Sequence, residues 1–396
     1  MQSPHAVVLG AGIGGLTAAI ALRRRGWRVS VYERAASLDP VGSGLGLAPN
    51  ALRALDSLGL GAQIRGQAAT PGDGGLRRPG GRWLVRTNGD AMTRAFGDSV
   101  AVILRADLVR VLAGQLSGVE LRTGTPVRLL DPGSARQRAT MATPDGQREA
   151  DLVVAADGIG SQTRALLFPQ HPGPRYSEFT TWRTVVPAPG GPLPFGEVWG
   201  RGMLTGLMPL SGGRIYFYAA ALARSGQRAA DDERAELARR FGSWCAPLPE
   251  LIGLIGLIGS ADPAVVLRND VYEMTVPLPA FAQGRVALLG DAAHAMTPFL
   301  GQGACQAIED AVVLGAALAR PDKDDVPGAL TGYSLARLDQ TSMVVRRSRR
   351  VSRAVAVRSR PGAALRDLGM AFGGLLPDSA AARAVMAGVQ LASSCW

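Results

Sequence analysis

Lysine, cysteine and histidine are all scarce in this chain. Only Lys323 is a lysine among the 43 basic residues, and there are three histidines. The cysteines also number three and lie far apart, at Cys245, Cys305 and Cys395. An odd number at such spacing indicates neither a disulfide framework nor a metal site, and it is compatible with a reducing compartment. We therefore expect no bound metal and a cytoplasmic protein.

The chain also lacks a long uninterrupted hydrophobic run. Its most apolar stretch, residues 248–258, is broken by glycine and is too short to span a bilayer. The opening residues MQSPHAVVLG lack the charged flank and apolar centre of a signal peptide. We therefore expect neither a transmembrane segment nor a secretion signal.

The composition is that of a globular protein with a positive charge. With 396 residues and 47% hydrophobic content, the chain has enough material for two domains or one large composite domain. Its net charge of +11 favours anionic cofactors, or it reflects a compositional preference for arginine. No nucleic-acid motif accompanies the charge, so we expect no nucleic-acid partner.

A glycine-rich loop follows the first predicted strand, residues 6–9. The loop GAGIGG fits GxGxxG and opens an alanine-rich helix over residues 14–25. A second strand, 29–32, ends at Glu33, at about the distance expected for a carboxylate that binds the adenosine ribose. This context predicts a dinucleotide-binding βαβ unit, whose glycines are Gly10, Gly12, Gly14 and Gly15.

Two further predicted strands end in an aspartate. The stretch DLVVAADG, 151–158, ends at Asp157 and is followed by Ser161 as a helix cap. The apolar stretch from Val286 ends at Gly290 and Asp291. In open α/β sheets the ligand lies outside the carboxyl ends of the strands. We therefore expect the three loops to meet at one sheet edge.

A small-residue helix is predicted to begin near Gln302, after Pro298. The backbone amides of Gly301, Gln302 and Gly303 would carry the positive end of its dipole. A ligand that gains negative charge, such as a reduced flavin ring, suits this place. A capped strand-turn-helix without a ligand is the alternative.

Two other segments are candidates for contact with a flat, anionic ligand. The glycine-rich stretch 42–47, which includes Gly46, has few side chains and leads into a helix capped near Asn50. Arg105 begins another helix, where an arginine opposes the dipole, so we expect it to have an anionic partner. A simple connecting loop and an exposed arginine remain the alternatives.

The middle of the chain changes to long β-prone runs separated by proline- and glycine-rich turns, as expected for an antiparallel sheet. We predict a discontinuous first domain over 1–75, 100–172 and 270–330, and a β-sheet domain over 76–99 and 173–269. Residues 331–396 form a helical C-terminal region. Its arginine cluster, 346–353, is a solvated face or a contact for the phosphates of a nicotinamide cofactor.

The three loop motifs in this order resemble the class A flavoprotein monooxygenases, which include para-hydroxybenzoate hydroxylase, salicylate hydroxylase and zeaxanthin epoxidase. The resemblance covers about residues 5–340. It implies an α/β fold with a Rossmann-type FAD-binding domain, an inserted antiparallel β-sheet substrate domain and C-terminal helices. This is the para-hydroxybenzoate hydroxylase-like fold.

The resemblance also implies roles for single residues. Glu33 would hold the adenosine ribose, Arg105 and Asp157 would lie by the ribityl-pyrophosphate portion, and Asp291 would bind the ribityl chain. Pro298 would sit beside the reactive edge of the flavin ring. The other implied FAD contacts are Gly10, Gly12, Gly14, Gly15, Arg34, Gly46, Gly290, Gly301, Gln302 and Gly303.

The chemistry implied by the resemblance is monooxygenation. NADH or NADPH would reduce a non-covalently bound FAD, O2 would add at flavin C4a, and the hydroperoxide would hydroxylate or epoxidise an electron-rich carbon, with a role in secondary metabolism. Flavin halogenases share the first motif but use a catalytic lysine, and the sole lysine lies in the loop PDKDD. The single GxGxxG in a βαβ context argues against a disulfide reductase-like enzyme.

Two other functions stay open. A reductase or dehydrogenase of the geranylgeranyl reductase type shares the FAD domain but transfers no oxygen. A non-catalytic flavin-binding sensor is the second alternative. The choice between NADH and NADPH, and between a monomer and a homodimer, also stays open.

Matching the β-sheet domain to the family indicates a substrate site lined by Gly206, Met208 and Tyr216, together with Trp182 and Phe299. Residues 203–210 contain no cation, so the arginine clamp of the benzoate hydroxylases is absent from that strand. We therefore expect a hydrophobic substrate, aromatic, indole-like or terpenoid. The alternative is that Trp182 and Met208 only pack the sheet.

The candidate catalytic residues are Pro298, Phe299 and His294. A phenol hydroxylase gains from a base that ionises the phenol, and His294 is the one histidine near the predicted chemistry. If His294 instead orders its loop, an epoxidation that needs no base becomes the better interpretation.

Overall fold

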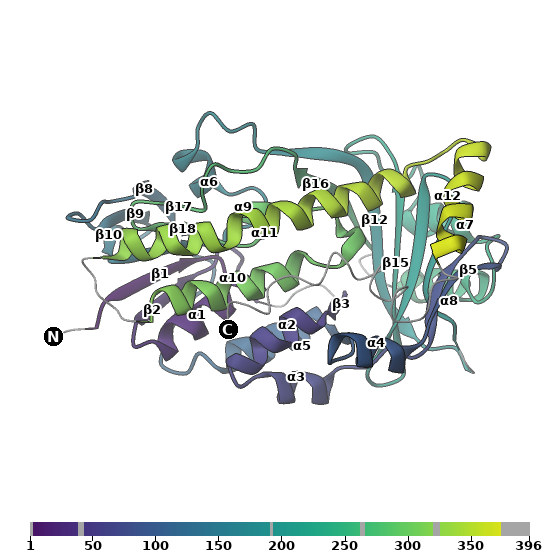
Figure 1. The fold of residues 1–396 in the computed structure, drawn as a ribbon, viewed down its shortest axis with the longest axis horizontal. Coiled ribbons are helices and arrows are strands. Elements are labelled where there is room, and N and C mark those ends of the chain that lie inside the picture. The colour runs from purple at the N-terminus through teal and green to yellow at the C-terminus, as the bar shows by residue number, and fades with distance from the viewer. Residues whose placement is uncertain (1–2, 39–42, 191–192, 262–265, 320–324, 374–396) are drawn as a thin grey trace.

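The structure is a computed structural model that describes residues 3–38, 43–190, 193–261, 266–319 and 325–373. The two largest sheets lie toward opposite ends of an elongated molecule (Figure 1), and the long helix α11 (Val326–Val355) runs from one toward the other. Lys323 and Cys395 lie outside the described residues.

A parallel sheet of six described strands forms the first of these two layers. Its order is β17-β18-β11-β1-β2-β7, and only β17 runs antiparallel to its neighbour. β1 and β11 are buried over almost their whole length, which explains their unbroken apolar sequences. The strand bounds are β1 His5–Leu9, β2 Arg28–Tyr32, β7 Glu120–Arg122, β11 Leu152–Ala155, β17 Ala282–Gln283 and β18 Val286–Leu288.

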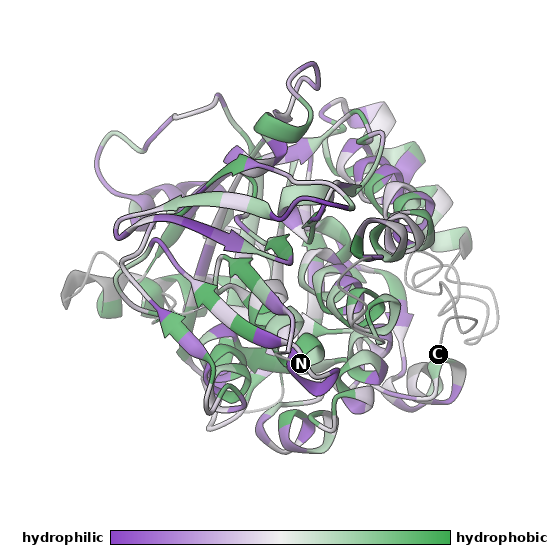
Figure 2. Ribbon diagram, turned by 90° about the vertical axis from the view of Figure 1, so that its left-hand side faces the viewer, coloured by the Kyte–Doolittle hydropathy of each residue, from purple (hydrophilic) through white to green (hydrophobic). Residues whose placement is uncertain are grey.

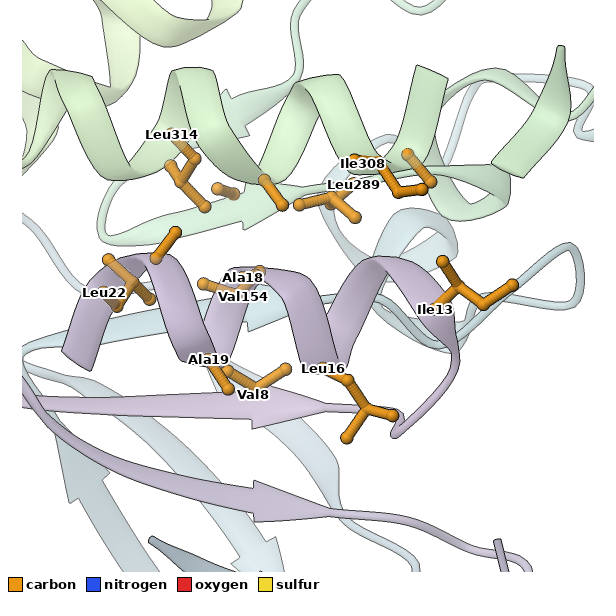
Figure 3. Packing of buried hydrophobic residues seen from close by; sticks show 14 of the residues in the cluster. Val8, Ile13, Leu16, Ala18, Ala19, Leu22, Val154, Leu289, Ile308 and Leu314 are labelled. Carbon is orange, nitrogen blue, oxygen red and sulfur yellow. The ribbon is translucent and has the colours of Figure 1, made fainter. Parts of the chain in front are cut away.

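Helix α1 (Ile13–Arg24) lies between this sheet and helix α10 (Gly303–Ala317), as Figure 3 shows. Small residues permit the close approach: a Cβ on Gly315 would lie 2.8 Å from the Cβ of Ala21. A Cβ on Gly14 would lie 2.5 Å from the side chain of Leu289. The alanine-rich composition of α1 is therefore a packing requirement. Protein atoms fill the space where a side chain at Gly14 would lie, and its predicted contact with the cofactor stays a prediction.

The rest of the first layer consists of short elements around the sheet. In Figure 2 the helices carry both hydrophobic and hydrophilic residues, as expected for elements with one buried side. The helices are α2 Pro49–Ser57, α3 Gly61–Gln67, α5 Arg105–Gly114, α6 Gln162–Leu167 and α9 Asp291–His294. The strands are the pair β3 Gly44–Leu47 and β6 Ala101–Leu104, and the three-stranded sheet of β8 Arg128–Asp131, β9 Ala139–Thr143 and β10 Gly146–Ala150.

A second sheet of seven described strands has the order β16-β12-β15-β14-β13-β4-β5. It is antiparallel as predicted, apart from the parallel pair of β13 with β4. The bounds are β4 Gly74–Arg77, β5 Trp83–Thr87, β12 Pro174–Pro187, β13 Phe195–Trp199, β14 Met203–Leu210, β15 Arg214–Leu222 and β16 Leu267–Met274. The strands come from the segments predicted for the β-sheet domain and slightly beyond them, while the division into domains stays a prediction.

Helices α7 (Glu233–Phe241) and α8 (Leu248–Ala261) cover one face of this sheet. The apolar side of α7 packs on the sheet, since its Leu237 and Phe241 are fully buried. The C-terminal region is helical as predicted, with α11 followed by α12 (Arg360–Gly373). In the part of the chain that the structure describes, no helix is long and apolar enough to cross a membrane.

Candidate active site

The carboxyl ends of β1, β11 and β18 lie side by side. Pairing of Leu9 with Ala155, and of Ala155 with Leu288, places the last residues of the three strands in register. Gly10 follows β1 with φ +100°, and a Cβ there would overlap the carbonyl oxygen of Ala156. Only glycine fits where these two loops touch. The predicted meeting of three loops at one edge is confirmed.

The glycine loop is held by Glu33. Its two carboxylate oxygens accept hydrogen bonds of 2.8 Å each from the backbone amides of Ala11 and Ala35. At the start of α1, a Cβ on Gly12 would meet no atom within 4 Å, so this glycine borders open space at the positive end of a helix. Arg34, the residue after Glu33, is exposed. The loop therefore offers room for an anion close to the backbone.

Asp157 follows β11 with one unused oxygen. Its Oδ2 accepts a hydrogen bond of 3.3 Å from the amide of Thr163, whereas its Oδ1 is buried and has no partner among the described residues. Ser161 caps α6 as predicted, accepting a hydrogen bond from the amide of Arg164. The Arg164 guanidinium donates to the carbonyls of Ile159 and Ala292, which ties this loop to the one after β18.

Asp291 and Arg105 face the same region from two different elements. Both side chains are reachable by solvent, yet protein surrounds them closely enough that burial raises the pKa of Asp291 and lowers that of Arg105. The charges of His294, Arg105 and Arg164 partly offset the change at Asp291. No described carboxylate lies within 4 Å of the Arg105 guanidinium. Arg105 thus has charge to offer to a bound anion.

In the segment before α10, one of the three backbone amides that were predicted to be free is hydrogen-bonded. Pro298 is exposed on a short 3-10 turn, and the Phe299 ring packs edge-on against Phe179, with centroids 4.9 Å apart. The Gly301 amide, predicted to be free, donates to the carbonyl of Pro298 at 2.9 Å. Of the three amides predicted to be free, those of Gln302 and Gly303 have no backbone acceptor among the described residues.

His294 lies in the protein interior and is 3% exposed. Its Nε2 is 2.5 Å from Asp310 Oδ2, and the same oxygen accepts the Gly290 amide at 3.0 Å. Arg337 donates to the other oxygen of Asp310 at 2.7 Å. This network fixes the loop after β18. The position supports the loop-ordering role for His294 and gives no support to the catalytic one.

The second sheet contacts strand β3 of the first layer through Tyr216. A Cβ on Gly44, at the start of β3, would overlap the Tyr216 ring, so the two layers are in direct contact there. Gly46, two residues on, is half-buried within β3 and lies near Val100. Burial raises the pKa of Tyr216 to about 12, an effect that the adjacent Arg183 only partly offsets. The strand bearing Tyr216 therefore borders the first domain.

Four residues form one row across this face of the sheet. Arg183 pairs with Tyr218, Tyr218 with Gly206, and Gly206 with Glu197 in successive antiparallel strands, so their side chains point the same way. Tyr218 leans over Gly206, where any Cβ would overlap its ring, and donates to Glu197 Oε1 at 2.8 Å. Of these four residues, the sequence prediction included only Gly206.

Trp182 does not lie on this face, so its predicted place in the substrate site is wrong. Successive residues of a strand point to opposite sides, and Trp182 packs with Phe217 and Phe241 under α7 and α8. Its indole nitrogen donates to Glu233 at 2.7 Å. The side chain that faces the first domain is that of Arg183. Met208, paired with Tyr216, shares that face, as predicted.

A cation is therefore present beside the predicted substrate site, although the strand 203–210 supplies none. Arg183 Nε is buried and has no partner among the described residues, while its NH2 group donates to Asn269 at 2.6 Å. The alternation of β12 gave the signal, because Arg183 and Trp182 had to face opposite ways. Helices α7 and α8 cover the face of the sheet that carries Trp182, so Arg183 is the residue on the open face.

The unused polar groups of this edge fit a large anionic cofactor such as FAD. They are the space beside Gly12, the free oxygen of Asp157, the unpaired Arg105 and the amides of Gln302 and Gly303. They lie on loops from four different elements, as binding of an extended molecule requires.

The comparison with known proteins identifies the family. A family described as "FAD binding domain" matches residues 4–246 and 271–348. The aurachin C monooxygenase/isomerase of Stigmatella aurantiaca is 35% identical over 348 residues, covering 87% of this chain and 88% of the relative. The FAD-dependent urate hydroxylase of Klebsiella pneumoniae is 33% identical over 363 residues, covering 87% and 88%.

A solved structure agrees with these relatives. Klebsiella pneumoniae HpxO complexed with FAD and uric acid superposes with a TM-score of 0.84 at 28% identity and covers 98% of both chains. The fold, the motifs and the relatives point to the same enzymes, and the expected class is confirmed. The chain belongs to the class A FAD-dependent monooxygenases, and FAD is its cofactor.

Proposed function

We propose that this enzyme uses NADH or NADPH and O2 to hydroxylate or epoxidise an aromatic small molecule. One observation carries the proposal: Gly44 pairs with Leu104, the residue before Arg105, and a Cβ on Gly44 would overlap the Tyr216 ring of the second sheet. The predicted cofactor groups and the polar face of the second sheet thus border one region. Bound FAD supplies the oxygen chemistry there, while the protein binds, orients and excludes water.

The proposed cofactor contacts follow the free groups at the edge. Gly12 and the start of α1 would receive the pyrophosphate, and Glu33 would bind the adenosine ribose while it braces the loop. Asp157 and Arg105 would hold the pyrophosphate and ribityl portion, with Asp291 on the ribityl hydroxyls. The remaining proposed contacts are Gly10, Gly15, Arg34, Gly46 and Gly290.

The flavin ring would lie between the start of α10 and the second sheet. The amides of Gln302 and Gly303 favour negative charge on the ring, because they stand at the positive end of a 15-residue helix. Pro298 would border its reactive edge. Phe299, packed against Phe179, would form the apolar wall that keeps water from the substrate.

The proposed substrate is an aromatic ring with polar substituents, which modifies the expectation of a wholly hydrophobic molecule. Arg183 and Glu197 place a cation and a carboxylate on the face shared with Met208 and Tyr216. The relatives support this choice, since they are named for aurachin C, urate and 3-amino-4-hydroxybenzoate. A role in secondary metabolism is part of the proposal.

The test measures NADH and NADPH consumption in air by the FAD-loaded enzyme with aurachin C, urate and 3-amino-4-hydroxybenzoate. We expect at least one ring of this type to accelerate consumption and to acquire labelled oxygen from ¹⁸O2. Accelerated consumption without label would favour a reductase of the geranylgeranyl reductase type. No acceleration by any aromatic compound would favour a flavin-binding sensor.

A Gly12→Ala variant tests the cofactor site. Since a Cβ at this position meets no protein atom within 4 Å, we expect the free energy of unfolding of the apoprotein to change by less than about 0.5 kcal/mol. FAD affinity should fall at least tenfold, because the methyl group would occupy the space proposed for the pyrophosphate. Urea unfolding of the apoprotein and FAD titration measure the two effects. Unchanged FAD affinity would contradict the placement.

We propose that the enzyme is located in the cytoplasm. We also propose that it is a monomer or a homodimer. The two-part organisation is proposed with the boundaries given by the sequence. In the C-terminal cluster, Arg349 pairs with Glu273 at 3.0 Å, whereas Arg346, Arg350 and Arg353 are exposed. These three arginines are the part of the cluster that is open to a nicotinamide cofactor.

A further inference from the structure

The most unusual group on the substrate-facing side of the second sheet is the carboxylate of Glu197. Each of its oxygens accepts one hydrogen bond: Oε2 from the indole of Trp199 at 2.6 Å and Oε1 from the hydroxyl of Tyr218 at 2.8 Å. No arginine or lysine in the described chain forms an ion pair with it. A carboxylate enclosed by protein without a cation is costly, so its position calls for an explanation.

The two hydrogen bonds differ in what they allow. An indole N–H only donates, so Oε2 must always accept from Trp199. A tyrosine hydroxyl both donates and accepts. The contact between Oε1 and Tyr218 can therefore hold the proton on either oxygen, with Tyr218 donating to the carboxylate or the protonated Glu197 donating to Tyr218. One proton can therefore move between Tyr218 and Glu197 along this hydrogen bond.

The geometry of the row directs this pair at the substrate side. Tyr218 lies over Gly206, and it packs against the same hydrophobic cluster as Phe299, the residue after Pro298. Its neighbour across β12 is Arg183, whose Nε has no partner among the described residues. An acidic group bound in front of this row would have a cation on one side and a proton acceptor on the other.

From this arrangement we propose that Glu197, acting through the hydroxyl of Tyr218, accepts the proton of an acidic O–H or N–H group on the aromatic substrate. The inference rests on the proposed monooxygenase function and supplies the base that His294 does not provide. The substrate O–H or N–H bond breaks and its proton joins Tyr218 Oη. The original Tyr218 proton passes to Glu197 Oε1, and a substrate anion remains beside Arg183. Total charge is unchanged.

The surroundings support uptake of that proton. Burial raises the pKa of Glu197, and the hydrogen bonds from Trp199 and Tyr218 only partly offset it. From β15 it faces Tyr218, whose ring lies 5.4 Å from that of Tyr216, and from β12 the cation in the same row is Arg183. From α12, Arg366 and Asp367 stand near Trp199, but they pair with each other at 2.8 Å. An anionic ring is more electron-rich, which favours attack by an electrophilic oxygen.

The test uses FAD-loaded enzyme and 4-nitrophenol, whose anion is recognised by its yellow absorbance, without NAD(P)H. We expect the native enzyme to bind the probe as the anion at pH values where the free phenol is still protonated. In Glu197→Gln and in Tyr218→Phe, the pH of half-ionisation of the bound probe should rise by about one unit or more. The double variant should show no further rise, because the two residues act in series.

Glu233→Gln is the matched control. Glu233 also accepts from a tryptophan indole, that of Trp182, but on the opposite face of the sheet, so its variant should leave the ionisation of the probe unchanged. The Glu197→Gln variant is expected to fold, because the carbonyl oxygen of the new amide side chain can still accept the hydrogen bond from Trp199. If Glu197→Gln does not fold, Tyr218→Phe gives the decisive comparison.

Several results would overturn the inference. These are binding of the probe as the neutral phenol, no binding to the native enzyme, or the same ionisation in Glu197→Gln and Tyr218→Phe as in the native enzyme. The measurement involves no turnover, so it is separate from the test of the proposed function. Ionisation without labelled product would leave the proton acceptor standing and reject the oxygenase proposal. Labelled product without ionisation of the probe would support the oxygenase proposal and reject the role of Glu197 and Tyr218 as proton acceptor.

Discussion

An Arg337→Met variant is expected to be less stable than the native protein by about 3–5 kcal/mol, because it leaves two buried carboxylates without their cation. Arg337 is 2% exposed and donates to Glu309 at 3.0 Å and to Asp310 at 2.7 Å. It also donates to the side chain of Gln306 at 2.8 Å. Methionine fills much of the same volume, so the loss would report the charge and the hydrogen bonds.

Urea unfolding of the apoprotein at pH 7 measures this loss. Arg350→Met on the same helix is the control, since Arg350 is exposed and its variant should change stability by less than about 0.5 kcal/mol. A loss in Arg337→Met no larger than in the control would show that the network contributes nothing.

The same network makes the loss dependent on pH. Burial alone would raise the pKa of Asp310, but the charges of His294 and Arg337 outweigh it and lower the pKa to about 2. A carboxylate with a lowered pKa stabilises the fold fully at pH values above the ordinary pKa of aspartate. This stabilisation is lost as the pH falls toward 2, where Asp310 becomes protonated in the folded protein. The stability difference between the native protein and Arg337→Met should therefore narrow as the pH is lowered through this range.

A Gly15→Ala variant is expected to lose on the order of 3 kcal/mol or more of stability, and FAD with it. Gly15 lies in the first turn of α1, and a Cβ there would overlap the carbonyl oxygen of Gly10. Backbone atoms cannot move aside as the end of a flexible side chain does, so α1 would have to shift from β1. Urea unfolding and the FAD content of the purified protein measure both effects.

Gly12→Ala, in the same loop, is the comparison for this experiment. It adds the same methyl group where no protein atom is near. The two variants should separate: Gly15→Ala loses stability of the apoprotein, whereas Gly12→Ala loses FAD affinity alone. Equal stability of the two apoproteins would mean that the contact of Gly15 with Gly10 is not as tight as the structure has it.

The first βαβ unit and the shared strand edge were predictable because local patterns encode them. An apolar strand, GxGxxG and an alanine-rich helix follow within a few residues, and their meaning does not depend on the rest of the chain. The strands that end near Asp157 and Asp291 were also predictable from a local pattern, a short apolar run followed by aspartate and glycine. These features give the cofactor half of the site.

The substrate half was less predictable because distant elements decide it. Alternation along β12 fixed that Trp182 and Arg183 face opposite ways, but only the packing of α7 and α8 decides which of them is covered. The pairing of Glu197 with Tyr218 needs the register of three strands, with Gly206 between them. No local sequence pattern contains that register.

The interior network was missed for a related reason. Glu309 and Asp310 in an otherwise small and apolar helix were a visible sign of buried charge. Their cation, Arg337, comes from the next helix, where it is one of many arginines in the chain. The sequence therefore left both a catalytic and a loop-ordering role open for His294 and did not indicate Asp310 as its partner.

The parallel pairing of β4 with β13 has a consequence for synthesis of the protein. Gly74 is paired with Phe195, so the β4 and β5 hairpin leaves the ribosome long before the strand that completes its edge exists. Until then its backbone groups on that edge have only water as a partner. Closing such distant pairs is slow, so we expect the β4 and β5 hairpin to join β13 late in folding, after β13 has paired with its sequence neighbour β14.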